Sequence, residues 1–176
     1  MGSPAGLPGV RRQGPLTLSY RIGSSGQTLH FTDDVLEHFA AHRQRHRWSA
    51  EAGGALFARI DGDDSAIVEA SGPRKSDLRS RFSYRARMAV VQAEIDDRFA
   101  HGLHYIGDWH SHPERVPRAS GIDESTMASR VRLSSHQLRG FVFAIVGTAA
   151  FPSGLTVLLH DGHKTYRLDP TASDLR

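Results

Sequence analysis

The sequence contains no cysteine among its 176 residues. This absence excludes disulfide-stapled scaffolds, zinc sites built from cysteine, and hydrolases that use a cysteine nucleophile. It also excludes the zinc deaminases, whose metal site needs a pair of cysteines. No apolar run approaches the roughly 20 residues that span a bilayer, so we expect no membrane partner. The chain also lacks a nucleophile elbow, a P-loop and a dinucleotide-binding fingerprint.

Positive charge exceeds negative charge only slightly in this sequence. The formal net charge is only +3, although the isoelectric point is about 9.7. An excess of this size is typical of a solvated surface, and we therefore expect no nucleic-acid partner. The apolar content of 39% and the charged content of 23% are ordinary for a globular protein. The length predicts one domain with a single well-developed core.

The two ends of the chain are predicted to lie outside this domain. Residues 1–15 contain glycine, proline and arginine but no hydrophobic signal core, and we interpret them as a disordered leader. Residues 16–170 form the domain and residues 171–176 a tail. In the absence of a targeting segment, the predicted location is the cytoplasm.

Two histidines one residue apart, His110 and His112, are the most informative feature. A strand places residues i and i+2 on the same face, so both imidazoles can aim at one ion if residues 105–112 are extended. Asp123 follows after a short loop. Together these are three good zinc ligands, the number that a catalytic zinc site usually takes from protein while a fourth position holds water.

Each part of this pattern has a structural alternative. An isolated His-x-His can consist of polar residues at the edge of a sheet. Ser120-x-x-Asp123 is also typical of a helix start with serine as the N-cap, a role that is compatible with metal ligation. The fixed spacing of His110 and His112 from Ser120 and Asp123 favours the metal site.

The His-Ser-His-Pro segment at 110–113, followed by Ser120 and Asp123, resembles the metal motif of the JAMM (MPN-plus) metalloproteases. That family also has a glutamate before an apolar strand of small residues, and Glu51 fits this element. The resemblance covers roughly residues 28–168. It implies the single-domain JAB/MPN fold, an α/β domain with a mixed, curved β-sheet flanked by α-helices, which the order of predicted elements also indicates.

The resemblance implies a role for each matching position. His110, His112 and Asp123 would hold one Zn²⁺, which can lower the pKa of a bound water from about 15.7 to about 7. Glu51 would act as the general base and carry the proton to the leaving amine. Ser120 would donate a hydrogen bond to the developing oxyanion.

Further polar residues could belong to metal sites. Asp108 shares the predicted strand face with both histidines and could orient one imidazole, with a surface aspartate as the alternative. His38 and His42 have the spacing of a zincin H-E-x-x-H motif, but Phe39 stands where the glutamate is needed. With His46 they would form a stripe along a helix, which we interpret as a solvated face, with an accessory metal site as the alternative.

Periodicity and turn residues predict the secondary structure. The predicted strands cover residues 16–22, 27–31, 54–60, 65–70, 105–112, 141–146, 155–160 and 164–168. The predicted helices cover residues 32–47, 84–101 and 121–136. Residues 71–81 are a polar, basic connection whose part from Arg74 to Arg81 is a candidate flap, beside a sheet edge that could pair with an extended substrate tail.

The resemblance implies a zinc-dependent metalloprotease that cleaves the amide or isopeptide bond after the C-terminal tail of a ubiquitin-like protein, in deconjugation or precursor processing. The chain looks most similar to the bacterial branch, whose members often accompany ubiquitin-activating-like and conjugating-like enzymes of the same operon, including antiphage operons. Two alternatives are a non-catalytic MPN scaffold and a JAMM peptidase of the cell wall or of DNA repair. The DNA-repair relatives carry His-Asn-His-Pro-Ser-Gly, from which this chain departs at Ser111 and Glu114.

Overall fold

The computed structural model describes residues 18–134 and 138–171. The predicted leader, residues 172–176 of the predicted tail and the predicted helix end at residue 136 lie outside these ranges. Within them, we find no helix with both the length and the apolar character needed to cross a membrane.

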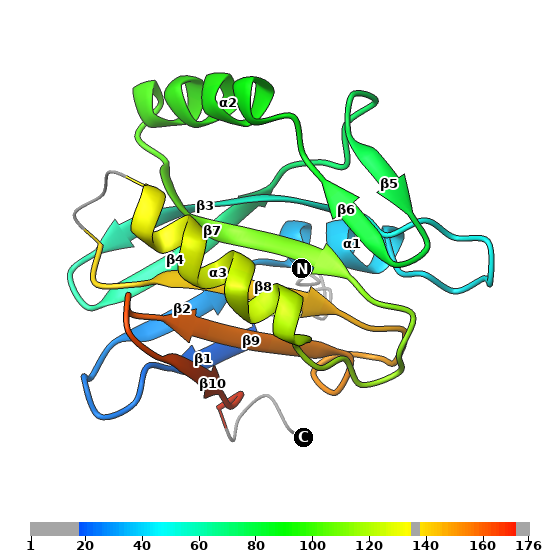
Figure 1. Ribbon diagram of the computed structural model, residues 1–176. Helices are drawn as coiled ribbons and strands as arrows, with labels where there is room; N and C mark the ends of the chain where they lie inside the picture. The colour runs from blue at the N-terminus through cyan, green and yellow to red at the C-terminus, as the bar shows by residue number, and fades with distance from the viewer. Residues whose placement is uncertain (1–17, 135–137, 172–176) are drawn as a thin grey trace, which may run out of the picture.

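The described chain folds into a mixed α/β arrangement (Figure 1). Its strands are β1 (Leu18–Arg21), β2 (Thr28–Phe31), β3 (Gly53–Asp61), β4 (Asp64–Ala70), β5 (Leu78–Ser80), β6 (Ser83–Arg85), β7 (His104–Ser111), β8 (Phe141–Val146), β9 (Leu155–His160) and β10 (Thr165–Leu168). Its helices are α1 (Asp33–Ala41), α2 (Met88–Ala100) and α3 (Gly121–Leu133). Eight strands form one sheet in the order β1-β2-β4-β3-β7-β8-β9-β10, and β5 pairs with β6 separately.

The large sheet contains both parallel and antiparallel pairs and curls on itself. The β2–β4 and β7–β8 pairs are parallel and the other neighbours are antiparallel. A bridge between Tyr20 and Pro170 brings β1 near the end of β10, so the curvature almost closes the sheet into a barrel. The predicted fold, a mixed and curved sheet flanked by helices, is confirmed.

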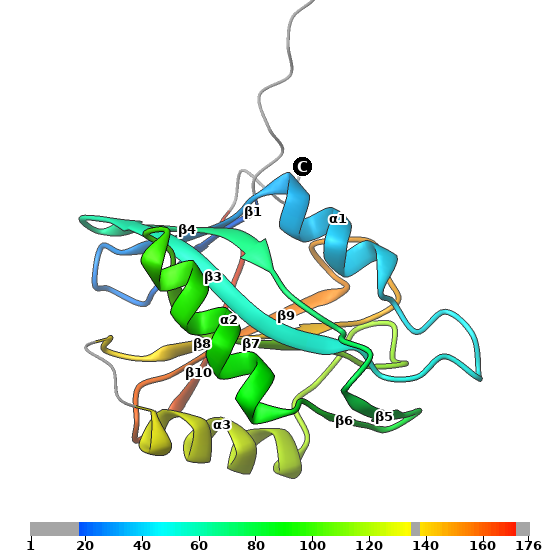
Figure 2. The same cartoon turned by 90° about the horizontal axis from the view of Figure 1, so that it is seen from above.

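The helices cover the two faces of the sheet (Figure 2). Val35 and Phe39 of α1 join the larger core, which also buries Trp109. Met127 and Val131 of α3 pack on the opposite face, against Phe141, Phe143, Ile145 and Leu158. The second helix, α2, lies on the same face as α3, and residues of both helices line one groove.

The first helix ends earlier than the sequence predicts. It stops at Ala41 instead of residue 47, and the Nδ1 atom of His42 lies 2.8 Å from the carbonyl oxygen of His38. The chain turns inward at this point because Gln44, only 3% exposed, bonds other segments through its side-chain amide. A helix through residue 47 would carry this amide away from those partners.

The second helix also differs from its prediction, at its start and in its exposure. Residues 83–85 pair with β5 as strand β6, so the helix begins at Met88 and not at residue 84. Of the apolar residues that recur at helical spacing, Val91 is buried, whereas Phe99 is 66% exposed. The apolar face of α2 therefore remains open toward the groove that it shares with α3.

A glycine in β7 allows the close approach of two strands. The register of β3 against β7 shifts between Leu56 and Phe57, opposite Gly107. Gly107 has a φ of 149°, and a Cβ atom there would lie 1.7 Å from the carbonyl oxygen of Val142 in β8. No side chain fits at this position, which lies directly before the segment that carries the paired histidines.

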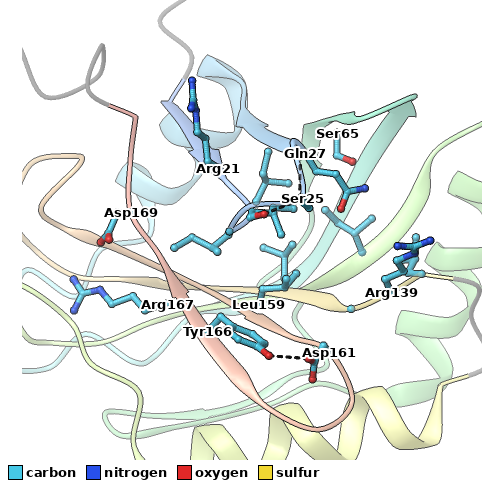
Figure 3. Close-up of a pocket in the computed structure, with 18 of the residues that line it drawn as sticks. Arg21, Ser25, Gln27, Ser65, Arg139, Leu159, Asp161, Tyr166, Arg167 and Asp169 are labelled. Atoms are coloured by element: carbon cyan, nitrogen blue, oxygen red, sulfur yellow. Dashed lines mark hydrogen bonds between the residues drawn. The ribbon is translucent and has the colours of Figure 1, made fainter.

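A cavity of about 1230 Å³ opens at the end of the sheet away from those histidines (Figure 3). Its centre is apolar and includes Leu159. Arg21 and Arg167 on its rim extend away from that centre. The hydroxyl of Tyr166 donates to the carboxylate of Asp161 over 3.1 Å. Since the charged groups do not converge on the cavity, we assign it no ligand.

Candidate metal centre and active site

The end of β7 brings His110 and His112 together as the strand alternation predicts. Their Nε2 atoms lie 3.1 Å apart. The backbone N–H of His112 donates to the carbonyl of Val146 over 2.8 Å, which keeps the chain extended past the last residue of β7. Trp109 and Ser111 point the other way and are buried, with 1% and 0% exposure.

The start of α3 adds Asp123 to the two imidazoles. Its Oδ1 lies 3.2 Å from Nε2 of His110, and its Oδ2 lies 3.6 Å from Nε2 of His112. Ser120 is the N-cap of this helix, and its side chain accepts a hydrogen bond from the N–H of Asp123 while the Asp123 carboxylate accepts one from the N–H of Ser120. This capping box fixes the Asp123 carboxylate beside the histidines.

The donor set fits a tetrahedral zinc ion. Ligand atoms that lie about 2.0–2.2 Å from such an ion are about 3.3–3.6 Å from one another. Nε2 of His110 lies 3.1 Å from Nε2 of His112 and 3.2 Å from Oδ1 of Asp123, whereas the 3.6 Å approach to Nε2 of His112 is made by the other carboxylate oxygen, Oδ2. Two imidazole nitrogens and a carboxylate oxygen are also the atoms that zinc prefers, so these residues could hold the metal once one Asp123 oxygen faces both imidazoles.

Glu51 reaches the same site from the chain that precedes β3. The register of β3 on β7 pairs Gly53 with His110 and so places Glu51 beside the histidines. Glu51, His110 and His112 offer ligand atoms that all lie within 4.8 Å of one another. Glu51 is only 8% exposed. Burial and the nearby Asp123 carboxylate raise the pKa of Glu51 to about 7, although the His110 ring opposes the shift.

The pKa values of the neighbouring Asp123 and His112 are lowered, whereas that of Glu51 is raised. Burial alone would raise the pKa of Asp123, but hydrogen bonding and charge from His110, with hydrogen bonds from Ser120, hold this pKa well below its usual value. Burial, followed by the adjacent His110 ring, lowers the pKa of His112. At neutral pH the site therefore offers an ionised carboxylate and a neutral imidazole, the forms that bind a metal.

Ser120 shows its structural role directly, because its hydroxyl donates to the Asp123 carboxylate over 2.7 Å. The alanine variant separates this role from oxyanion binding. We expect Ser120→Ala to retain metal and to lose about 0.5–2 kcal/mol of stability with the cap. If the hydroxyl turns its one proton from Asp123 to the reacting carbonyl during the reaction, the turnover of the variant falls by about 10²–10³-fold.

Turnover, metal content and urea unfolding of Ser120→Ala measure the three effects separately. Ser125→Ala is the matched control, because in the described part of the chain the Ser125 hydroxyl donates only to the Ile122 carbonyl of the same helix. An unchanged rate in Ser120→Ala, with the stability loss present, would leave Ser120 as a helix cap and nothing more.

Asp108 does not orient an imidazole in the way the sequence suggested. Its Oδ1 accepts from the Tyr105 hydroxyl and its Oδ2 from Nε of Arg130, each over 2.9 Å. In the described chain we find no hydrogen bond from Asp108 to either ligand histidine. Because Arg130 belongs to α3, this ion pair links β7, the strand that carries His110, to the helix that carries Asp123.

Gln44 is a buried residue of the site that the sequence pattern misses. Its side-chain N–H groups donate to the carbonyls of Ser49, at 3.1 Å, and Arg81, at 2.8 Å. Its oxygen accepts from the hydroxyl of Ser111, at 3.3 Å, and that hydroxyl accepts from the N–H of Ala52, at 2.9 Å. Gln44 thereby connects the segment before Glu51 to the metal strand.

The β5–β6 hairpin, which the sequence treats as part of a connection, holds the backbone of Glu51. The N–H of Glu51 donates to the carbonyl of Ser80 over 2.7 Å. The Nε of Arg79 donates to the carbonyl of Glu51 over 2.6 Å. Strands of three residues do not stand alone, so the hairpin needs anchors of its own.

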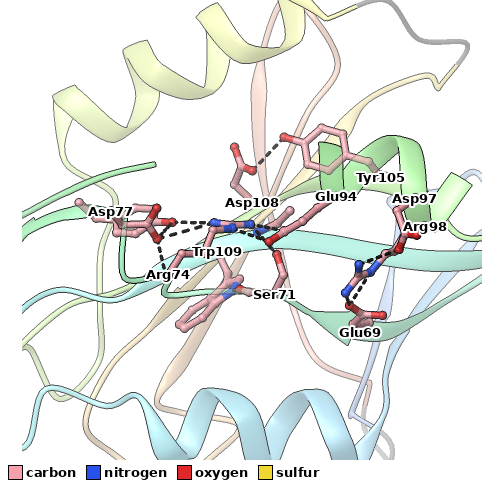
Figure 4. Close-up of polar contacts among 12 residues, drawn as sticks. Glu69, Ser71, Arg74, Asp77, Glu94, Asp97, Arg98, Tyr105, Asp108 and Trp109 are labelled. Carbon is pink, nitrogen blue, oxygen red and sulfur yellow. Dashed lines mark hydrogen bonds and ion pairs between the residues drawn. The ribbon is translucent and has the colours of Figure 1, made fainter. Parts of the chain in front are cut away.

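Arg74 supplies such an anchor (Figure 4). Its guanidinium forms a two-pronged ion pair with Glu94 of α2, with Nε to Oε1 at 2.6 Å, and also donates to the Ser71 hydroxyl. The Tyr84 hydroxyl accepts from Arg74 and donates to Asp77 over 3.0 Å. These bonds attach the hairpin to α2.

The His38 and His42 pair lies behind the metal strand. Their ring centroids are 4.5 Å apart, and both rings contact the buried Trp109. Burial lowers the pKa of His38, helped by His42. His46 lies beyond the end of α1 and stacks on Trp48, so the predicted three-histidine stripe on one helix is wrong.

Comparison with known proteins identifies a matching family and similar sequences. Residues 32–157 match the model of a family described as prokaryotic homologs of the JAB domain. A protein of Pseudomonas aeruginosa named CD-NTase/cGAS isopeptidase is 31% identical over 135 residues, which cover 75% of this chain and 85% of that protein. A protein of the same name from Escherichia coli is 32% identical over 93 residues.

The extent of these matches varies among relatives. The Escherichia coli match covers 51% of this chain and 60% of that protein, and a Vibrio cholerae protein of the same name, 30% identical, is covered over 59% of its length. A solution structure of a protein from Desulfitobacterium hafniense superposes with a TM-score of 0.56 at 23% identity, over 78% of this chain and 87% of that one. That likeness concerns the fold alone.

Proposed function

Because the chain belongs to the family of prokaryotic homologues of the JAB domain, we propose that it is a zinc-dependent isopeptidase of the JAMM type. Its substrate is the amide or isopeptide bond after the C-terminal tail of a ubiquitin-like protein. The observation that carries this proposal is the convergence of His110, His112 and Asp123 on one point, with Glu51 beside them. The complete donor set favours an enzyme over a non-catalytic scaffold.

The residues around the metal position divide the chemistry among them. A zinc ion held there would polarise the scissile carbonyl and acidify water. Glu51 accepts the proton of the attacking water and delivers it to the leaving amine. Burial raises the pKa of Glu51 to about 7 before the charge of an ion is counted, so this carboxylate is a stronger proton acceptor than an exposed glutamate. Ser120 donates to the developing oxyanion.

An exposed apolar surface toward the start of β7, together with the hairpin beside Glu51, supports a polypeptide substrate. The groove between α2 and α3 exposes Met88, Phe99 and Leu133, at 49%, 66% and 81%. An exposed apolar surface of this kind suits the apolar face of a folded protein. The β5–β6 hairpin, next to Glu51, offers a strand edge to an extended tail.

The names of the relatives point to a more specific substrate. Three of the similar proteins are named CD-NTase/cGAS isopeptidase. For the present chain we propose that the substrate is a conjugate that contains a CD-NTase. Ubiquitin-activating-like and conjugating-like enzymes of the same operon would form this conjugate. An antiphage role would follow from that substrate.

Cleavage of defined conjugates tests the proposal. The purified protein is incubated with two conjugates. In one, the C-terminal tail of a CD-NTase is joined to a lysine; in the other, the tail of a ubiquitin-like protein encoded beside this chain is joined to a lysine. We expect release of an intact C-terminal tail from at least one of them. A chelator should abolish the release and added zinc should restore it, both followed by mass spectrometry of the new C-terminus.

The control is a conjugate whose final tail residue is replaced by proline, which fixes φ and removes the backbone N–H at the cleaved end. Cleavage that persists in chelator after dialysis would contradict zinc dependence. Failure to cleave either conjugate by the zinc-loaded protein would contradict the proposed substrate class.

A further inference from the structure

Two arginine-rich segments frame the side of the metal centre on which Glu51 lies. They are residues 43–50, which end directly before Glu51, and residues 78–87, which include the β5–β6 hairpin. Together they contain seven arginines and no aspartate or glutamate. We name these two segments the basic lip. Such separation of charge is unexpected in a chain whose net charge is only +3.

Side-chain contacts join the two segments of the basic lip into one surface. Gln44 donates to the carbonyl of Arg81 over 2.8 Å. The Arg81 guanidinium donates in turn to the carbonyl of Arg47. Arg79 reaches back to the carbonyl of Ala50 over 3.3 Å. Because these bonds cross between the segments, the lip is a preformed surface.

The basic lip exposes two aromatic side chains. Trp48 and Phe82 are each 74% exposed. Arg81 brings them into one neighbourhood, because its guanidinium lies 5.2 Å from the Phe82 ring centroid while it bonds the carbonyl next to Trp48. Tryptophan and arginine are the residues most enriched at the centres of protein interfaces.

None of the seven guanidinium groups of the basic lip has a carboxylate partner among the described residues. Arg45, Arg47, Arg85 and Arg87 are among the exposed ones. Outside the lip, Arg74, Arg98 and Arg130 pair with carboxylates while other described arginines such as Arg59 do not, so the lip is set apart by its lack of aspartate and glutamate. The lip therefore carries an uncompensated positive field.

The place of the basic lip in the fold connects it to one part of a conjugate. Its hairpin holds the backbone of Glu51, the proposed proton carrier to the leaving amine. The groove between α2 and α3 is lined by His104 and Tyr105 at the start of β7, whereas the lip lies at the other end of that strand (Figures 1 and 2). A conjugate whose tail donor fills that groove would present its acceptor protein to the lip.

We propose that the basic lip binds an acidic surface, with apolar residues among its carboxylates, on the acceptor protein that carries the cleaved amine. Arginines would meet the carboxylates, and Trp48 and Phe82 would cover the apolar side chains. The identification of the bound protein as the acceptor of a conjugate rests on the proposed function. The binding itself needs neither metal nor turnover.

Trp48 offers a direct reporter of that binding, because the other tryptophan, Trp109, is 1% exposed. The probe is a peptide of four Glu-Glu-Leu repeats, and its match is four Gln-Gln-Leu repeats. The acidic peptide should change the emission of Trp48 saturably and bind about tenfold more weakly when salt rises from about 0.05 to about 0.5 M. The neutral peptide should produce no such change.

A charge-matched pair of variants locates the effect. Arg45→Glu with Arg47→Glu should lose the peptide response, whereas Arg59→Glu with Arg167→Glu, two exposed positions outside the lip, should keep it. With a cleavable conjugate of an acidic acceptor, the first variant should raise KM about five- to tenfold and leave kcat unchanged. A substrate whose leaving group is a single amino acid should show no difference.

Two results would overturn the basic lip as an acceptor site. One is an unchanged Trp48 emission with the acidic peptide at about 1 mM. The other is tighter binding of a twelve-nucleotide single-stranded oligothymidylate at equal salt, since exposed aromatics among arginines also suit nucleic acid. Peptide binding by a protein that cleaves no conjugate would refute the proposed function and support the lip as an acidic-protein surface.

Discussion

Replacing Glu51 by glutamine is expected to lower turnover by about 10²–10⁴-fold while fold and metal content stay unchanged. The amide keeps the size and the hydrogen-bonding capacity of the side chain but cannot accept a proton. The backbone bonds to Ser80 and Arg79 that hold this residue do not involve the replaced group. Steady-state kinetics and elemental analysis of the same sample measure the two quantities.

Glu124→Gln is the matched control, since Glu124 is an exposed carboxylate in the first turn of α3. Its turnover should equal that of the parent. Normal cleavage by Glu51→Gln would remove Glu51 from the role of proton carrier. Loss of metal from Glu51→Gln would instead make Glu51 a ligand.

The same substitution has a second readout in the metal-free protein. The pKa of Glu51 rises from 4.5 to about 7 on folding, so the folded state holds this proton more tightly than the unfolded state. The contribution of Glu51 to stability is therefore fully present below about pH 4.5 and is lost as the pH rises through about 7. Urea unfolding should show Glu51→Gln more stable than the parent at pH 8, by up to about 3 kcal/mol, and equal at pH 4. A constant difference between the two proteins would contradict the raised pKa.

His112→Ala and Asp123→Ala should each lose zinc and, with it, all turnover above background. Each removes one of three donors, and even the loss of a group that only supports a ligand weakens metal binding about 10–100-fold. Far-ultraviolet circular dichroism should remain native for His112→Ala. Asp123→Ala should also lose some stability, because Asp123 caps the N–H of Ser120.

His104→Ala is the control for these ligand variants. His104 stands in β7 like His110 but is exposed at its other end. The control should keep one zinc per chain, and its turnover should be unchanged with a substrate too small to fill the groove between α2 and α3, which His104 lines. Retention of zinc by His112→Ala would show that the two imidazoles do not share an ion.

The convergence of His110, His112 and Asp123 was predictable because its signals are local and periodic. Strand alternation places His110 and His112 on one face, and the serine at the helix start fixes Asp123 at the third position of α3. The approach of Glu51 depends on the pairing of β3 with β7, which periodicity does not specify. At that step the resemblance to a known motif supplied what local physics could not.

The features that escaped prediction depend on contacts between distant segments. Gln44 is one buried polar residue without a repeating pattern, and its partners include Arg81, 37 positions away. The β5–β6 strands have three residues each, which is too short for alternation to identify. Asp108 shares a strand face with the histidines, yet its carboxylate forms an ion pair with Arg130 of α3.

Diffraction from crystals of the zinc-loaded protein on both sides of the zinc absorption edge tests the central claim most directly. One anomalous peak per chain should lie about 2.0–2.2 Å from Nε2 of His110, Nε2 of His112 and a carboxylate oxygen of Asp123. Glu51 should stand outside bonding distance. The absence of a peak among these three side chains, or a peak at His38 and His42 instead, would contradict it.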